Sequence, residues 1–228
     1  QAKRGQDFAH EALRLARVSG DEPLIFMSEL RVCLASDYAG DLRAARAAIE
    51  AATAHEFAVM DAASPMLAYD ASAFAPGFRG TVAQEEGRLE ESLRWYEQGI
   101  ARARARGATE VLGWLVSFGT EAWLDFGDLA RASLAREAME IAERIGDPVS
   151  RSNAACALCR VRMQEGNLDA ATPLAEQWVE NARRGTNFTV SWALSTLAVL
   201  RCARGERDEA RRLAHEALAV AEAGGFGL

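Results

Sequence analysis

A glycine followed by a polar residue, and in four of five cases by leucine, recurs along the 228-residue chain. The intervals between successive glycines are 47, 40, 39 and 39 residues. The five copies are Gly40-Asp41-Leu42, Gly87-Arg88-Leu89, Gly127-Asp128-Leu129, Gly166-Asn167-Leu168 and Gly205-Glu206-Arg207. A fixed period of about 20 to 50 residues is typical of stacked repeat arrays. The spacing therefore predicts a series of similar structural units.

The chemistry of each copy suits the turn between two antiparallel helices. Glycine adopts the left-handed conformation that ends a helix without a Cβ clash. Asp41, Asp128 and Asn167, which follow three of these glycines, can cap the start of the next helix. We call the helix before this turn glycine the A helix and the helix after it the B helix. Each unit is then predicted to be an A–B hairpin.

Small residues occupy two fixed positions around every turn glycine. One position lies seven residues before the glycine and the other lies five residues after it. Small side chains at these two positions would let the two helices of a hairpin cross closely. The earlier position holds Cys33, Gly80, Thr120, Cys159 and Ala198, and the later one holds Ala45, Ser92, Ala132, Ala171 and Ala210. We call these ten residues the crossing positions, and their regularity predicts close helix crossings.

A second set of glycines marks the ends of the B helices. Gly107, Gly146, Gly185 and Gly224 lie 39 residues apart, and helix-start signals follow the first three of them. We predict an all-α, right-handed α–α superhelix formed by a single repeat array over residues 1–228. Its parts are a half-unit at 1–20 and units at about 21–63, 64–108, 109–147, 148–185 and 186–228. Because residues 1–20 match a B helix alone, we expect a piece of a longer chain.

The second unit departs from this pattern. Ser64-Pro65 is a good helix start, but it lies farther from its turn glycine than the comparable start signals of the third and fourth units lie from theirs. The surplus coincides with Ala75-Pro76-Gly77-Phe78, and proline inside a helix removes a hydrogen bond. We expect this A helix to be kinked or split there. Either a tolerated insertion or a functional bend would explain the departure.

Composition excludes some functions. The net charge of −7 argues against direct nucleic-acid binding, which needs a basic face. The sequence has no apolar run of 18 residues, the length that would indicate a membrane span. A cytoplasmic location is predicted. Arg102, Arg104 and Arg106 do not share one helical face, so we expect a solvated helix end.

The four cysteines fall on predicted A helices. Cys33, Cys156, Cys159 and Cys202 are expected to be buried, reduced thiols. Cys156 and Cys159 form a CxxC pair on one helical face, for which redox or metal roles are the alternatives. No second pair or neighbouring histidine completes a zinc motif. We therefore expect no metal and no cofactor.

The units resemble tetratricopeptide repeats, with glycine at the turn and small residues at the crossing positions. They differ in length, with 39–40 residues rather than the 34 typical of that family, and they lack its consistent Trp-Leu-Gly-Tyr signature. Longer units of this kind resemble the helical region of large bacterial signalling ATPases, either linked to an adenylate/guanylate cyclase or of the LuxR regulator type. Ala138–Pro148 and the turn Gln164-Glu165-Gly166-Asn167-Leu168 are similar to the cyclase-linked kind. This resemblance implies a sensory or interaction region.

The resemblance also implies a binding groove. In tetratricopeptide hairpins three A-helix positions, which lie thirteen, nine and six places before the turn glycine, face the concave surface. The candidate groove residues at these positions are Arg31, Phe74, Phe78, Trp114, Phe118, Glu121, Asn153, Arg160 and Trp192. The alternative is that the aromatic side chains pack between neighbouring repeats.

The predicted function is protein–protein interaction or regulation within a signal-transduction protein. The partner would be a peptide or protein segment, which another part of the parent chain could supply, and a homodimer is a further option. A sensor for a small ligand, such as a sugar or metabolite, is the alternative. An enzyme is not expected, because the chain has no P-loop, GxSxG or HExxH motif. His10, His55 and His215 are expected on solvated B-helix surfaces.

Overall fold

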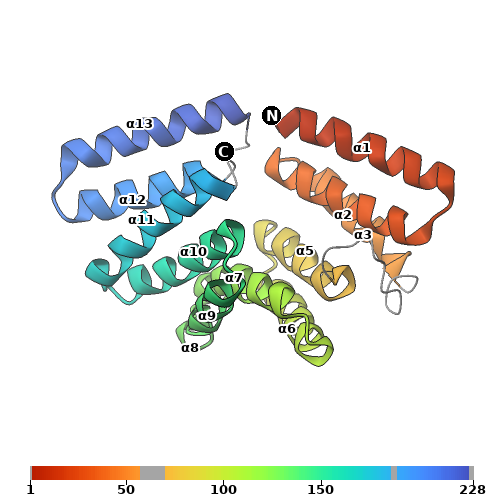
Figure 1. The fold of residues 1–228 in the computed structure, drawn as a ribbon, viewed down its shortest axis with the longest axis horizontal. Coiled ribbons are helices and arrows are strands. Elements are labelled where there is room, and N and C mark those ends of the chain that lie inside the picture. The colour runs from red at the N-terminus through yellow and green to blue at the C-terminus, as the bar shows by residue number, and fades with distance from the viewer. Residues whose placement is uncertain (1, 57–69, 186–188, 226–228) are drawn as a thin grey trace. The chain divides into compact units, whose positions relative to one another are not determined.

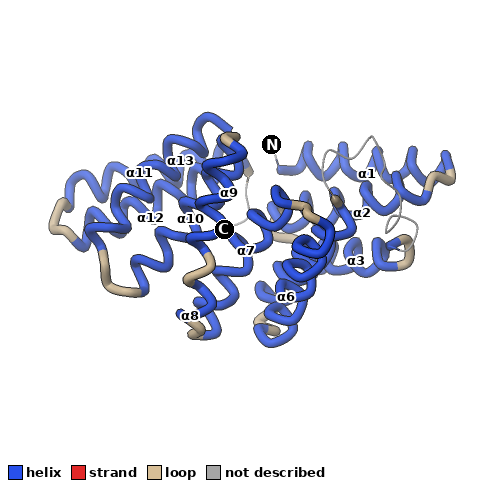
Figure 2. Tube along the Cα trace, turned by 60° about the horizontal axis from the view of Figure 1, so that its bottom comes forward, coloured by secondary structure: helices blue, strands red, loops and turns tan. Residues whose placement is uncertain are grey.

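The computed structural model describes residues 2–56, 70–185 and 189–225. Within these ranges helices are the only regular elements, and short loops connect them (Figure 2). The chain divides into two compact units, one of residues 1–111 with 225–228 and one of residues 112–224. The all-α class is therefore confirmed. The single array and its superhelical hand stay predictions.

The first unit contains a leading helix and two hairpins (Figure 1). Its helices are α1 (Ala2–Ser19), α2 (Glu22–Tyr38), α3 (Leu42–Thr53), α5 (Ala71–Glu85) and α6 (Leu89–Arg106). Helices α2 and α3 pack as one hairpin, and α5 and α6 pack as the next. Helix α1 packs against α2. The order along the chain is thus one B helix followed by two A–B pairs.

The second unit contains three further hairpins. Its helices are α7 (Thr109–Phe126), α8 (Leu129–Ala132), α9 (Ala135–Ile145), α10 (Pro148–Gln164), α11 (Leu168–Gly185), α12 (Val190–Ala203) and α13 (Arg207–Gly224). The first three residues of α7 belong to the first unit, and the second unit begins at Leu112. Helices α10 and α11 pack together, as do α12 and α13. Trp123 on α7 is among the largest fully buried side chains, with 1% of its surface exposed.

The turns have the predicted conformation. All five turn glycines have φ between +73° and +86°, a region that L side chains rarely adopt. The side chains of Asp41, Asp128 and Asn167 accept hydrogen bonds from backbone N–H groups three residues later, at 3.0–3.1 Å. Each bond satisfies a donor that the first turn of a helix otherwise leaves unpaired.

The ten crossing positions are all buried, as the repeat pattern predicts. At the fourth hairpin, the sulfur of Cys159 lies 3.5 Å from the backbone oxygen of Ala171 on the opposite helix. At the second, a Cβ added to Gly80 would lie 2.8 Å from Cε2 of Tyr96. These approaches leave no room for larger side chains, so the small residues are a steric requirement of the hairpin.

Helix α5 differs from the prediction. The proposed start at Ser64-Pro65 lies outside the described residues, and α5 begins at Ala71, capped by Asp70. Pro76 is its sixth residue, and the helix continues through it to Glu85, so the predicted split is wrong. In a regular helix the residue at position 76 would donate its backbone N–H to the carbonyl of Ser72, but proline has no N–H. That carbonyl instead accepts a hydrogen bond of 2.8 Å from Arg102 Nη1 on α6.

The B helix of the third hairpin is interrupted at Ser133-Leu134. The Ser133 hydroxyl donates to the backbone oxygen of Ala130 at 2.6 Å, and Leu134 N donates to the oxygen of Arg131 three residues earlier. Such local bonds compete with the regular helical ladder. The interruption separates α8 from α9.

The crossing positions generate a stability prediction. Replacing Cys159, which is fully buried, by leucine should cost about 1–3 kcal/mol of unfolding free energy through overpacking. The control is Cys202→Leu, at an exposed cysteine on α12, which should change stability by no more than about 0.5 kcal/mol. Chemical denaturation measures both. Equal effects of the two substitutions would show that the helices do not meet at Cys159.

Candidate functional site

Six of the candidate groove residues lie on A helices of the second unit, in one repeat register. Trp114, Phe118 and Glu121 lie on α7, Asn153 and Arg160 on α10, and Trp192 on α12. Each occupies one of the three repeat positions that the resemblance assigns to the concave surface. We call these six residues, with Cys156 and Val199, the A-helix face.

Side-chain contacts join neighbouring A helices along this face. Trp114 Nε1 donates to the Ser150 hydroxyl at 3.3 Å, and Arg160 Nη1 lies 3.5 Å from Glu121 Oε1. Both contacts connect α7 with α10. Glu121 and Arg160 hold the same repeat position, so at this point equivalent residues of consecutive repeats lie side by side.

The A-helix face is most exposed on α12. Trp192 is 49% exposed and Val199, two helical turns further on, is 58% exposed. Trp114, Phe118, Glu121 and Asn153 are half-buried, and Arg160 is exposed. Large apolar side chains separated by two turns of a helix project from the same side. This helix thus presents two large apolar side chains to solvent on one side, with the polar Ser195 and Thr196 between them.

Cys156 is a member of this face that the groove prediction missed. Its thiol donates to Glu121 Oε1 at 3.5 Å. Burial, followed by the negative charge of Glu121, raises the pKa of Cys156 above its ordinary value. The charge of Glu121 in turn raises the pKa of Arg160. The centre of the face therefore holds a protonated thiol beside an ion pair.

The remaining candidates lie in the first unit. Arg31 on α2 is exposed, and Phe74 on α5 is half-buried. Phe78 is only 7% exposed and belongs to the hydrophobic core of this unit. The rings of Phe74 and Phe78 meet edge to face, with centroids 4.8 Å apart. A groove continuous across both units stays a prediction.

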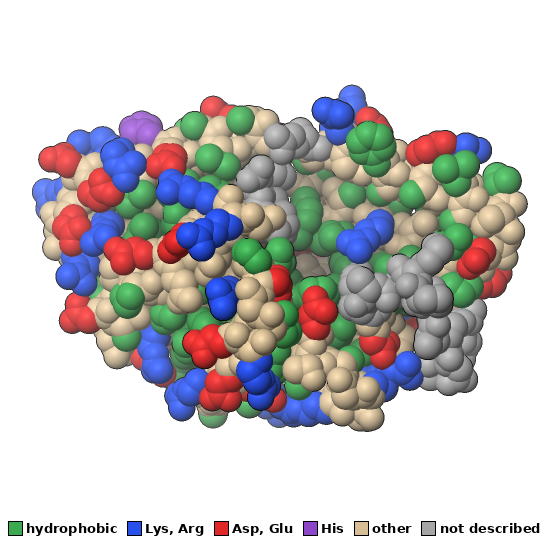
Figure 3. Space-filling view, viewed as in Figure 1, with side chains coloured by type: hydrophobic (Ala, Val, Ile, Leu, Met, Phe, Trp, Pro, Cys, Tyr) green, Lys and Arg blue, Asp and Glu red, His purple; other side chains and the backbone are tan. Residues whose placement is uncertain are grey.

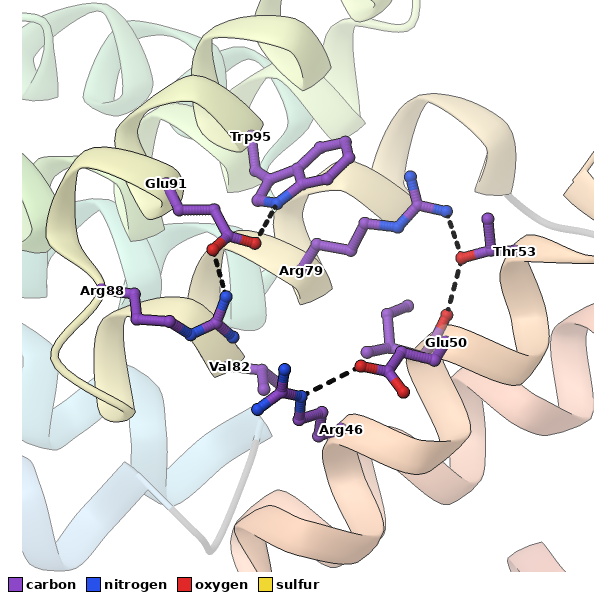
Figure 4. Close-up of a pocket in the computed structure, with 9 residues that line it drawn as sticks. Arg46, Glu50, Thr53, Arg79, Val82, Arg88, Glu91 and Trp95 are labelled. Carbon is purple, nitrogen blue, oxygen red and sulfur yellow. Dashed lines mark hydrogen bonds and ion pairs between the residues drawn. The ribbon is translucent and has the colours of Figure 1, made fainter.

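A cavity that the sequence did not indicate lies within the first unit, among α3, α5 and α6 (Figure 4). Its volume is about 210 Å³. The lining residues come from all three helices: Arg46, Ile49, Glu50, Thr53, Arg79, Val82, Arg88, Glu91 and Trp95. We call it the arginine cavity, because three guanidinium groups face it.

Ion pairs hold the arginines at the rim of this cavity. Arg46 pairs with Glu50 at 3.0 Å and with Glu86 at 3.4 Å. Arg88 pairs with Glu86 and with Glu91, and Trp95 Nε1 donates to Glu91 at 3.2 Å. These pairs are partly exposed to solvent, and ion pairs of that kind contribute only about 0–1 kcal/mol to stability. A competing ligand could therefore rearrange them at little cost.

The inner end of the cavity is a buried charge network. Arg79 Nη2 donates to Glu56 at 2.9 Å and to the Thr53 hydroxyl at 2.6 Å, and its guanidinium lies 4.7 Å from the centre of the Trp95 ring. Glu56 also accepts from Arg102 Nη1 at 2.6 Å. The side chains of Arg79 and Glu56 are only 12% and 11% exposed. Burial acts to raise the pKa of Glu56, but the hydrogen bonds and charges of Arg102 and Arg79 outweigh it and lower this pKa.

The expectation that Arg102 belongs to a solvated helix end is wrong. Arg102 is 22% exposed and bonds both Glu56 and the Ser72 carbonyl, and Arg106 pairs with Asp70. Counting charges along α6 alone could not reveal partners that come from α5 and from residue 56. Comparison with the other repeats could have marked Arg102 as unusual, since this position holds His55, Ala142, Asn181 and Val220 there.

The second unit has a groove in the equivalent place. Its cavity of about 370 Å³ lies among α11, α12 and α13. The rim is charged, with residues such as Glu176, Glu209 and Arg212, whereas the floor includes the buried side chains of Leu197 and Leu213. These leucines occupy the repeat positions that Arg79 and Trp95 hold in the first unit. The two grooves share a geometry but differ in the chemistry of the floor.

The cysteines and histidines match the expectations only in part. Cys33 and Cys159 are buried, and burial raises the pKa of each thiol to about 12. Cys202 is exposed, so its predicted burial is wrong: it lies three residues before the turn glycine, near the end of α12. His55 is half-buried at the end of α3 and contacts Glu22.

Neither a metal-ligand cluster nor a membrane-spanning helix is present among the described residues. Among them, no three His, Cys, Asp or Glu side chains are grouped so as to hold a metal ion. No helix in the described ranges is both long and apolar enough to cross a bilayer.

No protein-family model matches the chain, and no curated protein matches it. Several solved structures are similar to the chain. BtubC (BKLC) from P. vanneervenii is 14% identical, with 98% of this chain and 92% of that chain covered and a TM-score of 0.65. The nearly identical TPR-like repeats of a putative kinesin light chain from Podosopora anserina are 17% identical, with 86% and 95% covered and a TM-score of 0.54.

A third similar structure is a signal transduction ATPase with numerous domains (STAND) from Pyrococcus horikoshii, which has a tetratricopeptide repeat sensor. It is 15% identical, its TM-score is 0.59, and 87% of this chain but only 32% of that chain is covered. At these identities the likenesses show the fold alone. The chain has a TPR-like repeat fold.

The Arg102 contacts generate a second stability prediction. Arg102→Gln should cost about 1.5–3 kcal/mol, because hydrogen bonds to the buried Glu56 carboxylate and to the freed Ser72 carbonyl are lost. Arg94→Gln, at an exposed arginine on the same helix, is the control and should cost no more than about 0.5 kcal/mol. Denaturant unfolding measures both. A neutral Arg102→Gln would contradict the role of the network.

The lowered pKa of Glu56 predicts a pH dependence. Its ionised form is favoured by folding, so this stabilisation is complete above the ordinary value of 4.5 and is lost as pH falls through the folded pKa. Between about pH 6 and about pH 3, the wild-type chain should therefore lose more stability than Glu56→Gln does. Glu140→Gln, at an exposed site, should leave the slope unchanged. Parallel slopes for wild type and Glu56→Gln would refute the assignment.

Proposed function

We propose that this chain is a protein-interaction module that binds an extended partner segment along the A-helix face. The observation that carries the proposal is the exposure of two large apolar side chains on one side of α12, Trp192 and Val199, each about half exposed. Aromatic side chains with a polar surround are typical of the residues that dominate protein interfaces. Glu121, Asn153 and Arg160 provide such polar groups in the same register.

Charge favours a protein partner over nucleic acid. The chain has a net charge of −7, and many of its arginines form ion pairs with neighbouring carboxylates. On the face shown in Figure 3, positive and negative side chains are interspersed, without a patch of one sign. Nucleic-acid binding requires a clustered basic surface. An uncharged or mixed-charge peptide fits this surface better.

The partner segment could belong to the same parent protein. The STAND ATPase among the similar structures has a tetratricopeptide repeat sensor within a multidomain chain. We infer by analogy that this repeat region regulates an output domain, either a nucleotide cyclase or a transcription regulator. That analogy rests on the fold, which hosts many functions.

Trp192→Ala separates binding from stability. Because Trp192 is half exposed, its truncation should lower the unfolding free energy by no more than about 1 kcal/mol, whereas Trp123→Ala in the core should cost about 3–5 kcal/mol. Thermal and denaturant melts measure both. A loss at Trp192 as large as that at Trp123 would place Trp192 in the packing between repeats.

A peptide library displayed on phage and selected on the purified chain tests binding. Selected peptides should bind Trp192→Ala more weakly by at least about 1 kcal/mol, roughly fivefold. Peptides that bind wild type and Trp192→Ala equally, or no enrichment at all, would contradict the proposal. Light scattering of the chain alone distinguishes a homodimer, which would occupy the face with a second copy.

A further inference from the structure

Helix α1 matches α13 in the repeat pattern, but one of its faces is bare. His10-Glu11-Ala12-Leu13 has the same sequence as His215-Glu216-Ala217-Leu218, which sets the register between the two helices. Three matching positions are Gly5, Phe8 and Ala12 on α1 and Ala210, Leu213 and Ala217 on α13. All three are buried on α13, against which α12 packs, and all three are exposed on α1. The side of α1 that corresponds to the hairpin crossing is therefore open.

This open side continues along α1 at helical spacing. Phe8 is 68% exposed, and Leu15, two helical turns further on, is 54% exposed. Together with Gly5, Ala12 and Ser19, these residues recur every three or four positions, the spacing at which two helices pack side by side in a coiled coil. We call these five residues the α1 face. Small and large side chains alternate along it, and none of them is charged.

Gly5 has no structural role within the described residues. A Cβ added to it would meet no atom within 4 Å, whereas one added to Gly80, at a crossing position of the second hairpin, would lie 2.8 Å from Tyr96. Glycine inside a helix weakens that helix relative to alanine. The packing of α1 within the chain therefore does not explain why this residue is small. Residues that break a local rule without an internal reason are expected at functional sites.

The alternation makes the α1 face complementary to a second copy of itself. If two copies of α1 pair antiparallel with His10 at the midpoint, Phe8 lies opposite the partner's Ala12 and Leu15 lies opposite the partner's Gly5. Each large side chain then enters the hole that a small one leaves, as knobs-into-holes packing requires. A parallel pair would instead place Phe8 against the partner's Phe8 and leave a gap between the two glycines.

One flank of the α1 face is closed and the other is open. Helix α2 packs against α1 (Figure 1), where Ala9 and Ala16 are buried on the closed flank. The open flank carries Arg4, Glu11 and Val18, all of them exposed. In an antiparallel pair the open flanks of the two copies lie side by side. Arg4 is then opposite the partner's Val18, and Glu11 approaches the partner's Glu11 near the midpoint.

The charges near this midpoint are balanced. The Glu11 carboxylate already accepts hydrogen bonds from Arg14 Nη2 at 2.7 Å and from Arg14 Nε at 2.8 Å. Two such ion pairs bring two carboxylates and two guanidinium groups together at the midpoint. Like charges therefore do not oppose the antiparallel pair, and no charged group has to be buried in its centre.

We propose that the α1 face joins two copies of this chain as an antiparallel helix pair. Phe8 and Leu15 of each copy are buried in the holes at the partner's Ala12 and Gly5. Helix α1 belongs to the first unit, and the peptide surface proposed above belongs to the second. Separate variants therefore test the two surfaces, and either proposal can fail without the other.

The small size of the surface sets the strength of the association. One pair of 18-residue helices, each about 27 Å long, is a limited contact. It buries less than the roughly 1,200 Å² at which stable protein interfaces begin. The dimer should therefore be weak, with a dissociation constant on the order of 10 µM.

Sedimentation velocity of the purified chain, from about 1 µM to about 300 µM, measures the association. Phe8→Glu, at an exposed side chain, should weaken it at least tenfold. Gly5→Leu, which fills the hole without meeting any atom of its own chain, should do the same and should not lower the melting temperature. His10→Glu, on the opposite side of α1, and Trp192→Ala, on the A-helix face, are the controls and should leave the association unchanged.

A chain that stays monomeric at about 300 µM would overturn the proposal. So would a dimer that neither Phe8→Glu nor Gly5→Leu weakens. A dimer that Trp192→Ala dissociates would place the second copy on the A-helix face instead, which likewise contradicts a contact through α1.

Cysteine cross-linking tests the antiparallel direction. In a Cys202→Ser background, which removes the exposed native thiol, Glu11→Cys lies near the midpoint and should form an intermolecular disulfide under mild oxidation. Arg4→Cys should not, because the partner's Arg4 lies near the opposite end of the pair. Any result other than faster cross-linking at position 11 would overturn the antiparallel arrangement.

Discussion

The close crossing of the two helices in each hairpin is the constraint on which the rest of the structure depends. Every crossing position is small and buried, and at Gly80 even a methyl group would clash with Tyr96. Close crossing brings the backbones together and lets short side chains, mostly alanine, fill the core. Tight packing of this kind loses stability when volume is either added or removed. It also fixes the register in which the A helices present their outer side chains.

The second hairpin keeps this crossing, but one of its backbone carbonyls, that of Ser72, takes its hydrogen bond from another helix. Pro76 removes one backbone donor inside α5, and Arg102 from α6 supplies another to the Ser72 carbonyl. The Arg102 side chain is only 22% exposed there, and Glu56 provides its counter-charge. Glu56 then accommodates Arg79 as well, which would otherwise be an unpaired charge. Pro76 is therefore linked, contact by contact, to the charge network at the inner end of the arginine cavity.

The parts of the fold that depend on local chemistry could be predicted from the sequence. Turn glycines, aspartate caps and small crossing residues act within a hairpin, so a period of 39 or 40 residues reveals them. Trp192 could be placed on an outer face by the same register, although its exposure could not. The arginine cavity could not be predicted, because Arg46, Arg79 and Arg88 come from three helices and only the packing of two hairpins unites them. The continuity of α5 through Pro76 likewise depends on a donor from another helix.

Repetition makes such departures informative. In an array, each position is repeated in a nearly constant environment, so the other copies indicate which residue packing alone would select. By that standard Cys159 and Thr120 are ordinary, since each is a small residue at a crossing position. Arg79 and Trp95 are not, since leucine fills the same two positions in the fifth hairpin and remains buried there. A surface aromatic such as Trp192 lies between these cases, because an outer position tolerates many residues. A residue that departs from the repeat pattern is therefore stronger evidence for function in the arginine cavity, where burying a charge costs free energy. On the A-helix face an unusual side chain costs little.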